Sequence, residues 1–289
     1  MVIHRPVMPA EVMGMLNVQK NGVYVDGTVG TAGHALEIVK ALAGGRLIAV
    51  DRDEEAQKLA AERLMGKPVD FVKENFSRIA NIVESFGLKG VDGILFDLGM
   101  SMFQVKDYER GFSFDSDYPL DMRMDRTSGR SAKEVVNTLN RAELEKIFRD
   151  LGEEPNYMKI ADAIVKTRRI TKIQSCRQLS QIVLDIYGGR GKVHPATRTF
   201  QALRIYVNNE LDSLSKGLCG ARDVLNPGGR LCVISYHSLE DRIVKGFLAE
   251  SKLQGSMAVL TKKPVTAQVQ EVKENPAARS AKLRGGIKL

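Results

Sequence analysis

The feature that most constrains the fold is a series of short apolar segments, each followed by turn residues and a polar or helical stretch. Four lie in the first third of the chain and a fifth comes late, at residues 22–26, 46–51, 69–72, 91–97 and 230–235. Apolar runs of this length are typical of strands buried on both faces of a parallel sheet. Helical patterns at residues 35–43 and 54–64 separate the first three. The strand, helix, strand order predicts an open α/β sheet.

The pattern changes after the fourth segment, and strand signals are then missing for about a hundred residues. Capping boxes at 131–134 and 175–178 begin helices in this stretch, and apolar residues recur within them at helical spacing. The sequence therefore predicts a core of residues 1–106 and 201–289, interrupted by an inserted, mainly helical lobe at 107–200.

Three further expectations concern the last third of the chain. Pro195 opens a long helix that returns the chain to the sheet, and Asn-Pro-Gly-Gly at 226–229 turns it into the last strand. The tail at 251–289 is rich in Lys and Arg, which is compatible with strand, coil or an arm over RNA.

Composition narrows the class of protein. The net charge of +8 and the pI near 9.3 favour a polyanionic partner, although many basic proteins bind no nucleic acid. Apolar runs fall short of the roughly 18 residues of a membrane span, and residues 1–10 lack the apolar stretch of a signal peptide. We therefore expect a cytoplasmic protein without membrane association.

The three cysteines show no CxxC spacing and no HExxH occurs, so a bound metal is not expected.

A glycine-rich turn, Gly27 to His34, follows the first strand, and the second strand ends in Asp51. Such a turn lets a nucleotide approach bare backbone, and a carboxylate after the second strand can accept hydrogen bonds from ribose hydroxyls. Together they predict a cofactor that contains adenosine. The glycine spacing does not fit G-x-G-x-x-G, which disfavours NAD and FAD, and no P-loop occurs. Alternatively, Asp51 caps the next helix.

Two further polar residues follow strands at the edge where open α/β sheets bind ligands. Asp97 could hold an adenine amino group, the amino acid end of a methyl donor or a substrate amine; alternatively, it caps the loop. His237 could hold or deprotonate a substrate base, or cap the helix that follows. The lack of a G-x-S-x-G elbow disfavours a hydrolase.

Several longer motifs then identify a family. Residues 110–114 and 119–125, 194–204 and 237–245 resemble the signatures of the bacterial 16S ribosomal RNA cytosine-N4 methyltransferases, the RsmH or MraW family. The resemblance continues through residues 26–34, 51–53, 152–154 and 275–284, and so covers nearly the whole chain.

The resemblance implies a class I, Rossmann-like methyltransferase sheet with a helical recognition lobe. It also implies methyl transfer from S-adenosylmethionine to N4 of a cytidine in the decoding region of 16S rRNA, within the small ribosomal subunit. By resemblance, the cofactor contacts map onto Ala32, Gly33, His34, Asp51, Phe76, Asp97 and Gln104. Phe76 would lie against the adenine. Proposed phosphate contacts are Arg110, Arg123, Arg198, Arg204, Lys262 and Lys263, about half of which we expect in internal ion pairs or on solvated surface.

The chain departs from the family pattern at three places in the predicted site. Ala32 replaces a glycine, which is tolerable if its φ is negative. Met102 and Phe103 replace a serine and a proline, and could reshape the entrance for the target base. Tyr236 replaces a phenylalanine.

The proposed chemistry needs an acceptor for the cytosine amine, because its lone pair is delocalised into the ring; Asp97 and His237 are the tentative catalytic residues. Two alternatives remain open. One is a noncatalytic RNA-binding or ribosome-assembly factor with the same fold, and the other is a nicotinamide-dependent oxidoreductase. The oligomeric state is not predicted.

Overall fold

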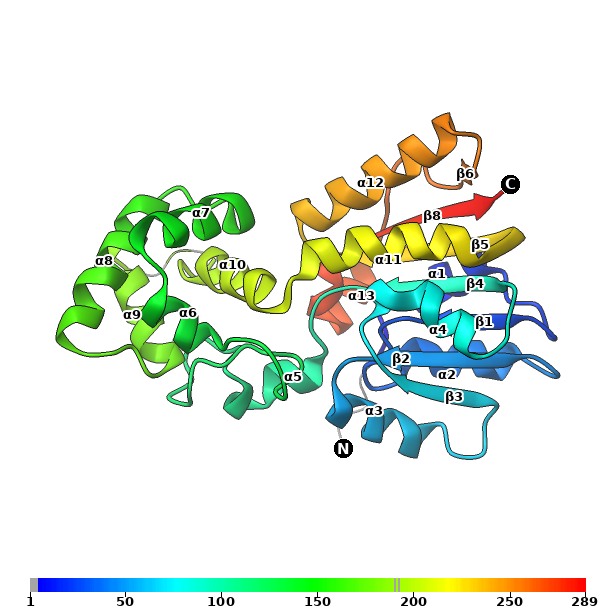
Figure 1. Ribbon diagram of the computed structural model, residues 1–289, viewed down its shortest axis with the longest axis horizontal. Coiled ribbons are helices and arrows are strands. Elements are labelled where there is room, and N and C mark those ends of the chain that lie inside the picture. Colours follow the sequence, from blue (N-terminus) through cyan, green and yellow to red (C-terminus); the bar gives the residue numbers. More distant parts are fainter. Residues whose placement is uncertain (1–4, 190, 192) are drawn as a thin grey trace. The chain divides into compact units, whose positions relative to one another are not determined.

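The computed structural model describes residues 5–189, 191 and 193–289, which form two compact units (Figure 1). The first unit consists of Met1–Gly99 and Leu211–Leu289, and the second of Met100–Glu210. The second unit is thus inserted between two parts of the first. It begins earlier and ends later than the predicted range 107–200.

The first unit contains the predicted sheet, in the order β3-β2-β1-β4-β5-β8-β6. The first five strands of this order are parallel, and β8 runs antiparallel to β5. The strands are β1 (Val23–Asp26), β2 (Arg46–Asp51), β3 (Val69–Lys73), β4 (Val91–Asp97), β5 (Leu225–Ser235), β6 (Met257–Val259), β7 (Val265–Thr266) and β8 (Lys282–Lys288). The prediction of an open α/β fold is confirmed.

Helices cover both faces of the sheet because alternate strand residues point to opposite sides. Leu47 and Ala49 of β2 belong to one buried cluster, whereas Ile48 and Val50 belong to the other. The first cluster also contains residues of α1 (Pro9–Leu16), α2 (Gly33–Ala41), α3 (Glu54–Arg63), α13 (Val269–Glu274) and the short helix η3 (Pro276–Ser280). The second contains residues of η1 (Phe76–Arg78), α4 (Ile79–Ser85), α11 (Glu210–Val224) and α12 (Ser238–Leu253). The result is a three-layer sandwich.

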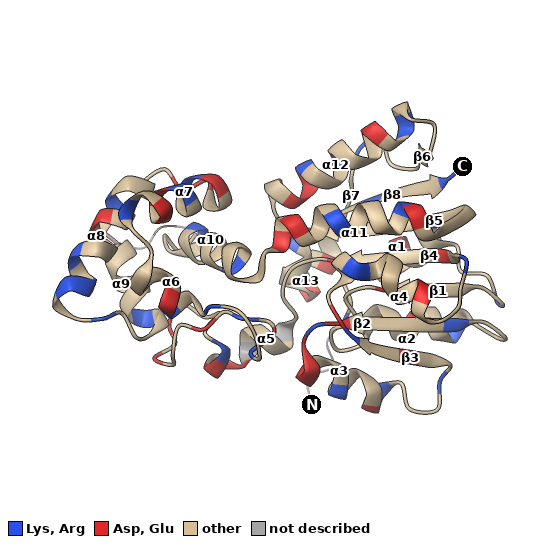
Figure 2. Ribbon diagram, in the orientation of Figure 1, with Lys and Arg blue, Asp and Glu red and all other residues tan. Residues whose placement is uncertain are grey.

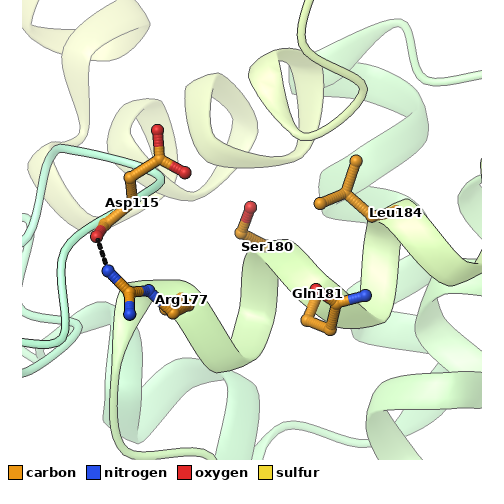
Figure 3. A pocket seen from close by; sticks show the side chains of 5 residues that line it. All are labelled: Asp115, Arg177, Ser180, Gln181 and Leu184. Carbon is orange, nitrogen blue, oxygen red and sulfur yellow. Dashed lines mark hydrogen bonds between the residues drawn. The ribbon is translucent and has the colours of Figure 1, made fainter. Parts of the chain in front are cut away.

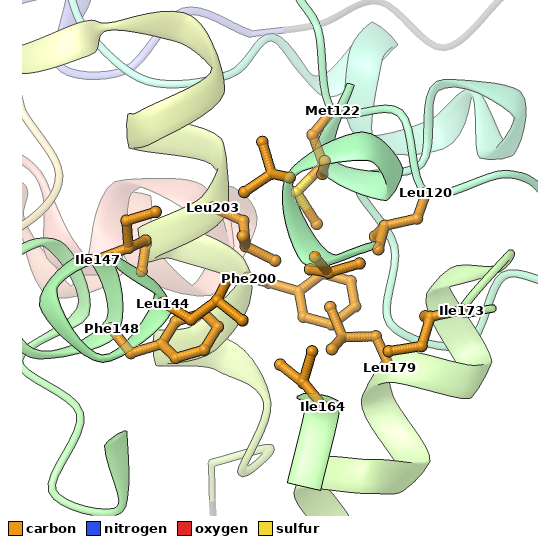
Figure 4. Close-up of a cluster of buried hydrophobic side chains, with 14 of the residues drawn as sticks. Leu120, Met122, Leu144, Ile147, Phe148, Ile164, Ile173, Leu179, Phe200 and Leu203 are labelled. Atoms are coloured by element: carbon orange, nitrogen blue, oxygen red, sulfur yellow. The ribbon is translucent and has the colours of Figure 1, made fainter. Parts of the chain in front are cut away.

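The second unit is helical and has its own hydrophobic core (Figure 4). Its elements are α5 (Met102–Lys106), η2 (Tyr108–Arg110), α6 (Ala132–Thr138), α7 (Arg141–Gly152), α8 (Tyr157–Ile170), α9 (Cys176–Tyr187) and α10 (Thr197–Asn208). The capping boxes expected at 131–134 and 175–178 begin α6 and α9. Leu144, Phe148, Ile164, Leu179 and Phe200 meet at the centre of this core.

Two expectations for the last third of the chain need correction, and the structure decides a third that was left open. The long helix after Pro195 is two helices, because Asn209 has a φ of 48° and breaks it between α10 and α11. Residues 226–229 lie within β5, where Val91 pairs with Leu225 and Gly93 with Arg230, so the expected turn is a bulge in the strand. The basic tail is ordered and supplies β8, beside β5.

Within the part of the chain that the structure describes, no helix is both long and apolar enough to cross a membrane.

Asn208 joins the end of α10 to the loop before α6. Its side chain is 6% exposed; Oδ1 accepts from Met124 N at 2.8 Å, and Nδ2 donates to Met122 O at 2.8 Å and Arg204 O at 2.9 Å. Asn208→Ala leaves buried backbone groups without this partner, so we expect a loss of about 2–3 kcal/mol in the free energy of unfolding, measured by urea denaturation. Gln181→Ala, which removes an exposed amide of α9, should cost under about 0.5 kcal/mol. Equal losses of unfolding free energy in the two variants would contradict the stabilising role assigned to Asn208.

Candidate active site at the edge of the sheet

The site lies where the order of the sheet reverses direction. From β1 the chain proceeds outward through β2 to β3, and it then returns to β4 on the other side of β1 before it reaches β5. In open α/β sheets, ligands bind in the crevice at the carboxyl ends of the strands that flank such a switch point. Asp26 ends β1 and Asp97 ends β4, and Asp51 ends the adjacent strand β2.

The glycine-rich turn begins with a close packing contact. A Cβ on Gly27 would lie 2.5 Å from a ring carbon of Phe96, so only glycine fits between the turn and β4. Thr28 then joins the two strands, because its backbone N–H donates to Asp26 Oδ1 at 3.1 Å and its hydroxyl accepts from Asp97 N at 2.7 Å. The turn therefore fixes the ends of β1 and β4 relative to each other.

The Asp51 carboxylate holds the middle of the same turn. Its Oδ2 accepts from Gly30 N at 2.9 Å, and its Oδ1 accepts from Asp53 N at 2.9 Å. The cap of α3 is Asp53, which accepts from the N–H groups of Glu55 and Ala56, so the alternative that gave this role to Asp51 is wrong. A carboxylate offers about four lone-pair sites, and two remain for ribose hydroxyls.

Asp97 lies between two side chains from distant parts of the chain. Its Oδ1 accepts from the Tyr236 hydroxyl at 2.7 Å, and its Oδ2 lies 3.5 Å from His34 Nε2. The side chain keeps 20% of its surface exposed, so a ligand can reach it. Burial raises the pKa of Asp97 to about 7, although the hydrogen bond from Tyr236 opposes this rise.

Asp26 adds a third carboxyl group to the site. It is 1% exposed, and its burial raises its pKa to about 7, with a further contribution from the negative charges of Asp97 and Asp51. Three carboxyl groups thus converge at one edge of the sheet. A cationic group placed among them would relieve their mutual repulsion.

Phe76 follows β3 and packs beside the glycine-rich turn. Its ring lies 4.8 Å from that of Phe96, between centroids, and a Cβ on Gly27 would lie 3.2 Å from the Phe76 Cβ. Its ring is half-buried, which leaves an apolar edge near the turn.

The next predicted contacts lie at the start of α2. Gly33 is the first residue of this helix, and His34 is buried beside Asp97. Ala32, before it, has a φ of 65°, so the condition under which an alanine would be tolerated here, a negative φ, is not met. The left-handed conformation costs an alanine roughly 1–2 kcal/mol, which the hydrogen bond from Ala32 N to Val29 O helps to offset.

The two remaining predicted site residues serve as helix caps. His237 Nδ1 accepts from Glu240 N at 3.4 Å, and its Nε2 lies 3.2 Å from Glu240 Oε1, so His237 forms the N-terminal cap of α12. Gln104 belongs to the second unit, where its Oε1 accepts from Ser101 N in the capping box of α5. The ring of Phe103 faces the Arg110 guanidinium, and the side chain of Met102 lies outside the described part of the structure.

The basic residues predicted to contact phosphate divide into two groups. Arg110 is 1% exposed and pairs with Asp107, Arg123 binds Asp121 through two nitrogens, and Arg204 binds Glu210 in the same way. These three side chains stabilise the second unit, and their expected role in RNA contact is not supported. The exposed residues are Arg198, Lys262 and Lys263.

Sequence reasoning missed two residues of the site. Asp26 ends a strand as Asp51 and Asp97 do, and this shared position was the signal that could have identified it. Tyr236 was noted only as a departure from a family pattern. Its hydrogen bond with Asp97 joins residues 139 positions apart and could not be predicted locally.

A separate cavity of about 290 Å³ lies in the second unit, lined by Asp115, Arg177, Ser180, Gln181 and Leu184 (Figure 3). The Arg177 guanidinium donates to Asp115 O at 2.8 Å and pairs with Asp117 at 2.9 Å. The cation that lines this cavity is held by these internal contacts. The cavity is therefore a weaker candidate for a functional site than the carboxyl groups at the edge of the sheet.

Asp26 generates a prediction about the pH dependence of stability. Its pKa is raised from 3.8 to about 7 on folding, so the stability that it contributes is complete below pH 4 and is lost as pH rises through 7. Asn cannot ionise, and it can still accept from Thr28 N. The free energy of unfolding of Asp26→Asn, relative to the unmodified protein, should therefore rise by on the order of 3 kcal/mol between pH 4.5 and 7.5. Urea denaturation at both pH values measures this difference.

Asp241 provides a control of opposite sign. Although burial raises its pKa, hydrogen bonds from Arg284 and Lys282 outweigh burial and lower it. Asp241→Asn should consequently lose stability, relative to the unmodified protein, as pH rises toward about 4, and the difference should stay constant at higher pH. A pH-independent difference for Asp26→Asn would show that Asp26 does not titrate as described.

Comparisons with known proteins agree with one another. Residues 1–288 match the MraW methylase family. The chain is 47% identical to the ribosomal RNA small subunit methyltransferase H of Persephonella marina, over 98% of each chain. It is also 47% identical to the protein of the same name from Geobacter sulfurreducens, over 99% of each chain. The chain belongs to the MraW methylase family.

Proposed function

We propose that this protein transfers a methyl group from S-adenosylmethionine to N4 of a cytidine in the decoding region of 16S rRNA. The observation that carries the proposal is the convergence of Asp26, Asp51 and Asp97 at the switch point of the sheet. The family and the relatives' names, which specify small-subunit ribosomal RNA, support the substrate class.

The charge of the site suits this cofactor. S-adenosylmethionine carries a cationic sulfonium and an amino group, and it has no phosphate. The pyrophosphate of NAD would instead meet three carboxyl groups, which disfavours the alternative of a nicotinamide-dependent oxidoreductase. Asp51 would hold the ribose hydroxyls, Phe76 would lie against the adenine, and Asp97 would attract the ammonium group of the amino acid end.

When bound, the cofactor supplies an electrophilic methyl group. The protein must then hold the cytosine amine in line with it and accept a proton from the amine. Asp97 is the better acceptor of the two tentative catalytic residues, because its carboxyl group remains accessible and its pKa near 7 matches physiological pH. His237 Nδ1 already accepts from Glu240 N, and its Nε2 lies 3.2 Å from the Glu240 carboxylate.

The second unit is the proposed site of RNA recognition. Figure 2 shows Lys and Arg along α8, with an acidic residue among them. The exposed cations of α8 and of the loop that follows it are Lys159, Lys166, Arg169 and Lys172. Such side chains bind phosphates without reading sequence, and the target cytidine must leave its stack to reach the methyl donor.

The direct test is transfer of labelled methyl from S-adenosylmethionine to small ribosomal subunits that lack cytosine-N4 methylation, followed by nucleoside mass spectrometry. We expect N4-methylcytidine as the product. Asp97→Asn removes the proton acceptor and should lower the rate by at least about 100-fold.

Gln254→Ala, which removes an exposed side chain at the end of α12 opposite to His237, is the control and should keep the normal rate. RNA binding without methyl incorporation would favour the alternative of a noncatalytic assembly factor. Label in another nucleoside would support methyl transfer and contradict the cytosine-N4 assignment.

A further inference from the structure

Among the residues that the structure describes, Tyr236 donates a hydrogen bond to the Asp97 side chain and is not one of the predicted cofactor contacts. Its hydroxyl donates to Asp97 Oδ1 at 2.7 Å, while Oδ2 faces His34 Nε2 at 3.5 Å. Each carboxylate oxygen is thereby directed to a different partner. This arrangement fixes the rotation of the carboxylate plane about its bond to Cβ.

The Tyr236 side chain is itself held rigidly. Its backbone N–H donates at 2.8 Å to Oε2 of Glu240, a buried residue of α12. Its ring lies against the bend after β4, because a Cβ on Gly99, whose φ is 95°, would be 3.2 Å from Tyr236 Cδ2. One residue thus contacts both the side chain at position 97 and the backbone two residues later.

We propose that Tyr236 is a positioning residue that orients the Asp97 carboxylate and keeps it ionised for binding of the methyl donor. This inference rests on the proposed function only in its last part, the link to donor binding. Tyr236 is also one of the positions at which the chain departs from the family pattern, so Tyr236→Phe restores the residue of that pattern while it removes only the hydroxyl group.

The charges around Asp97 explain why its carboxylate needs a hydrogen-bond donor. Asp26 of β1 and Glu240 of α12 place negative charge near Asp97 and favour its protonated form, and the His34 imidazole of α2 lies 3.5 Å from Asp97 Oδ2. Burial, Asp97, Glu240 and Glu271 raise the pKa of Tyr236 well above 10, so its hydroxyl keeps its proton and remains a donor. A hydrogen bond donated to the charged form stabilises that form.

The first experiment measures the titration of Asp97 directly in the ligand-free, full-length protein. Carboxyl-carbon NMR of protein labelled with ¹³C-aspartate gives one titration curve for each Asp, and the signal missing in Asp97→Asn identifies Asp97. We expect a midpoint near pH 7 in the unmodified protein and a midpoint about one pH unit higher in Tyr236→Phe.

Tyr24→Phe is the matched control. The Tyr24 hydroxyl is also buried in the first unit, but it accepts from Gln19 N at 2.7 Å and does not contact Asp97. This variant should leave the Asp97 midpoint unchanged. An unchanged or lower midpoint in Tyr236→Phe, or an equal shift in both variants, would overturn the proposal.

The second experiment measures binding of S-adenosylhomocysteine by calorimetry between pH 6 and 9. At pH 7 we expect Tyr236→Phe to bind roughly fivefold more weakly, because a smaller fraction of Asp97 is ionised, and the difference should shrink toward pH 9. In the Asp97→Asn background, Tyr236→Phe should have no further effect. A loss that is the same at every pH, or that persists in this background, would overturn the link to donor binding.

The two experiments separate the inference from the proposed function. A shifted Asp97 midpoint in a protein that binds no S-adenosylhomocysteine would support the positioning role and reject the proposed cofactor. Normal donor binding without methyl transfer to ribosomal RNA would leave the positioning role supported and reject only the proposed substrate.

Discussion

The parallel pairing of β1 with β4 is the contact on which the site depends. This pairing places the carboxyl ends of two strands that are far apart in sequence beside each other, and the hydroxyl of Thr28 joins them through Asp97 N. Every later feature follows from that junction. The glycine-rich turn leaves the end of β1, its middle is held by Asp51 from β2, and β4 ends in Asp97.

The same junction concentrates negative charge in a buried place, which lowers stability in the absence of a ligand. Burial raises the pKa of Asp26 and Asp97 to about 7, so near neutral pH these two groups are partly protonated. Binding of a cation would convert this unfavourable arrangement into an attractive one. The carboxyl groups that the fold brings together at this edge of the sheet therefore favour a cofactor with positive charge.

Features encoded by local sequence were predictable. The strand ends at Asp51 and Asp97 followed from apolar runs that stop at a polar residue, and the capping boxes of α6 and α9 followed from residues three apart. Each depends on residues that are neighbours along the chain. Sequence alone therefore located much of the edge at which the candidate site lies.

Features that depend on tertiary contact were not predictable in this way. Three features depend on what packs against a segment. They are the hydrogen bond between Tyr236 and Asp97, the pairing of Arg204 with Glu210 and the bulge after Leu225. The positive φ of Ala32 belongs to the same class, because nothing in the identity of an alanine signals a left-handed turn. Such residues determine the electrostatics of the site more than its location.

A crystal structure of the protein with S-adenosylhomocysteine would locate the cofactor site directly. We expect the ribose hydroxyls within about 3 Å of the Asp51 carboxylate oxygens and the amino acid end beside Asp97. Binding of the ligand elsewhere, or with its ribose away from Asp51, would contradict the claim that the three carboxyl groups at the switch point form the cofactor site.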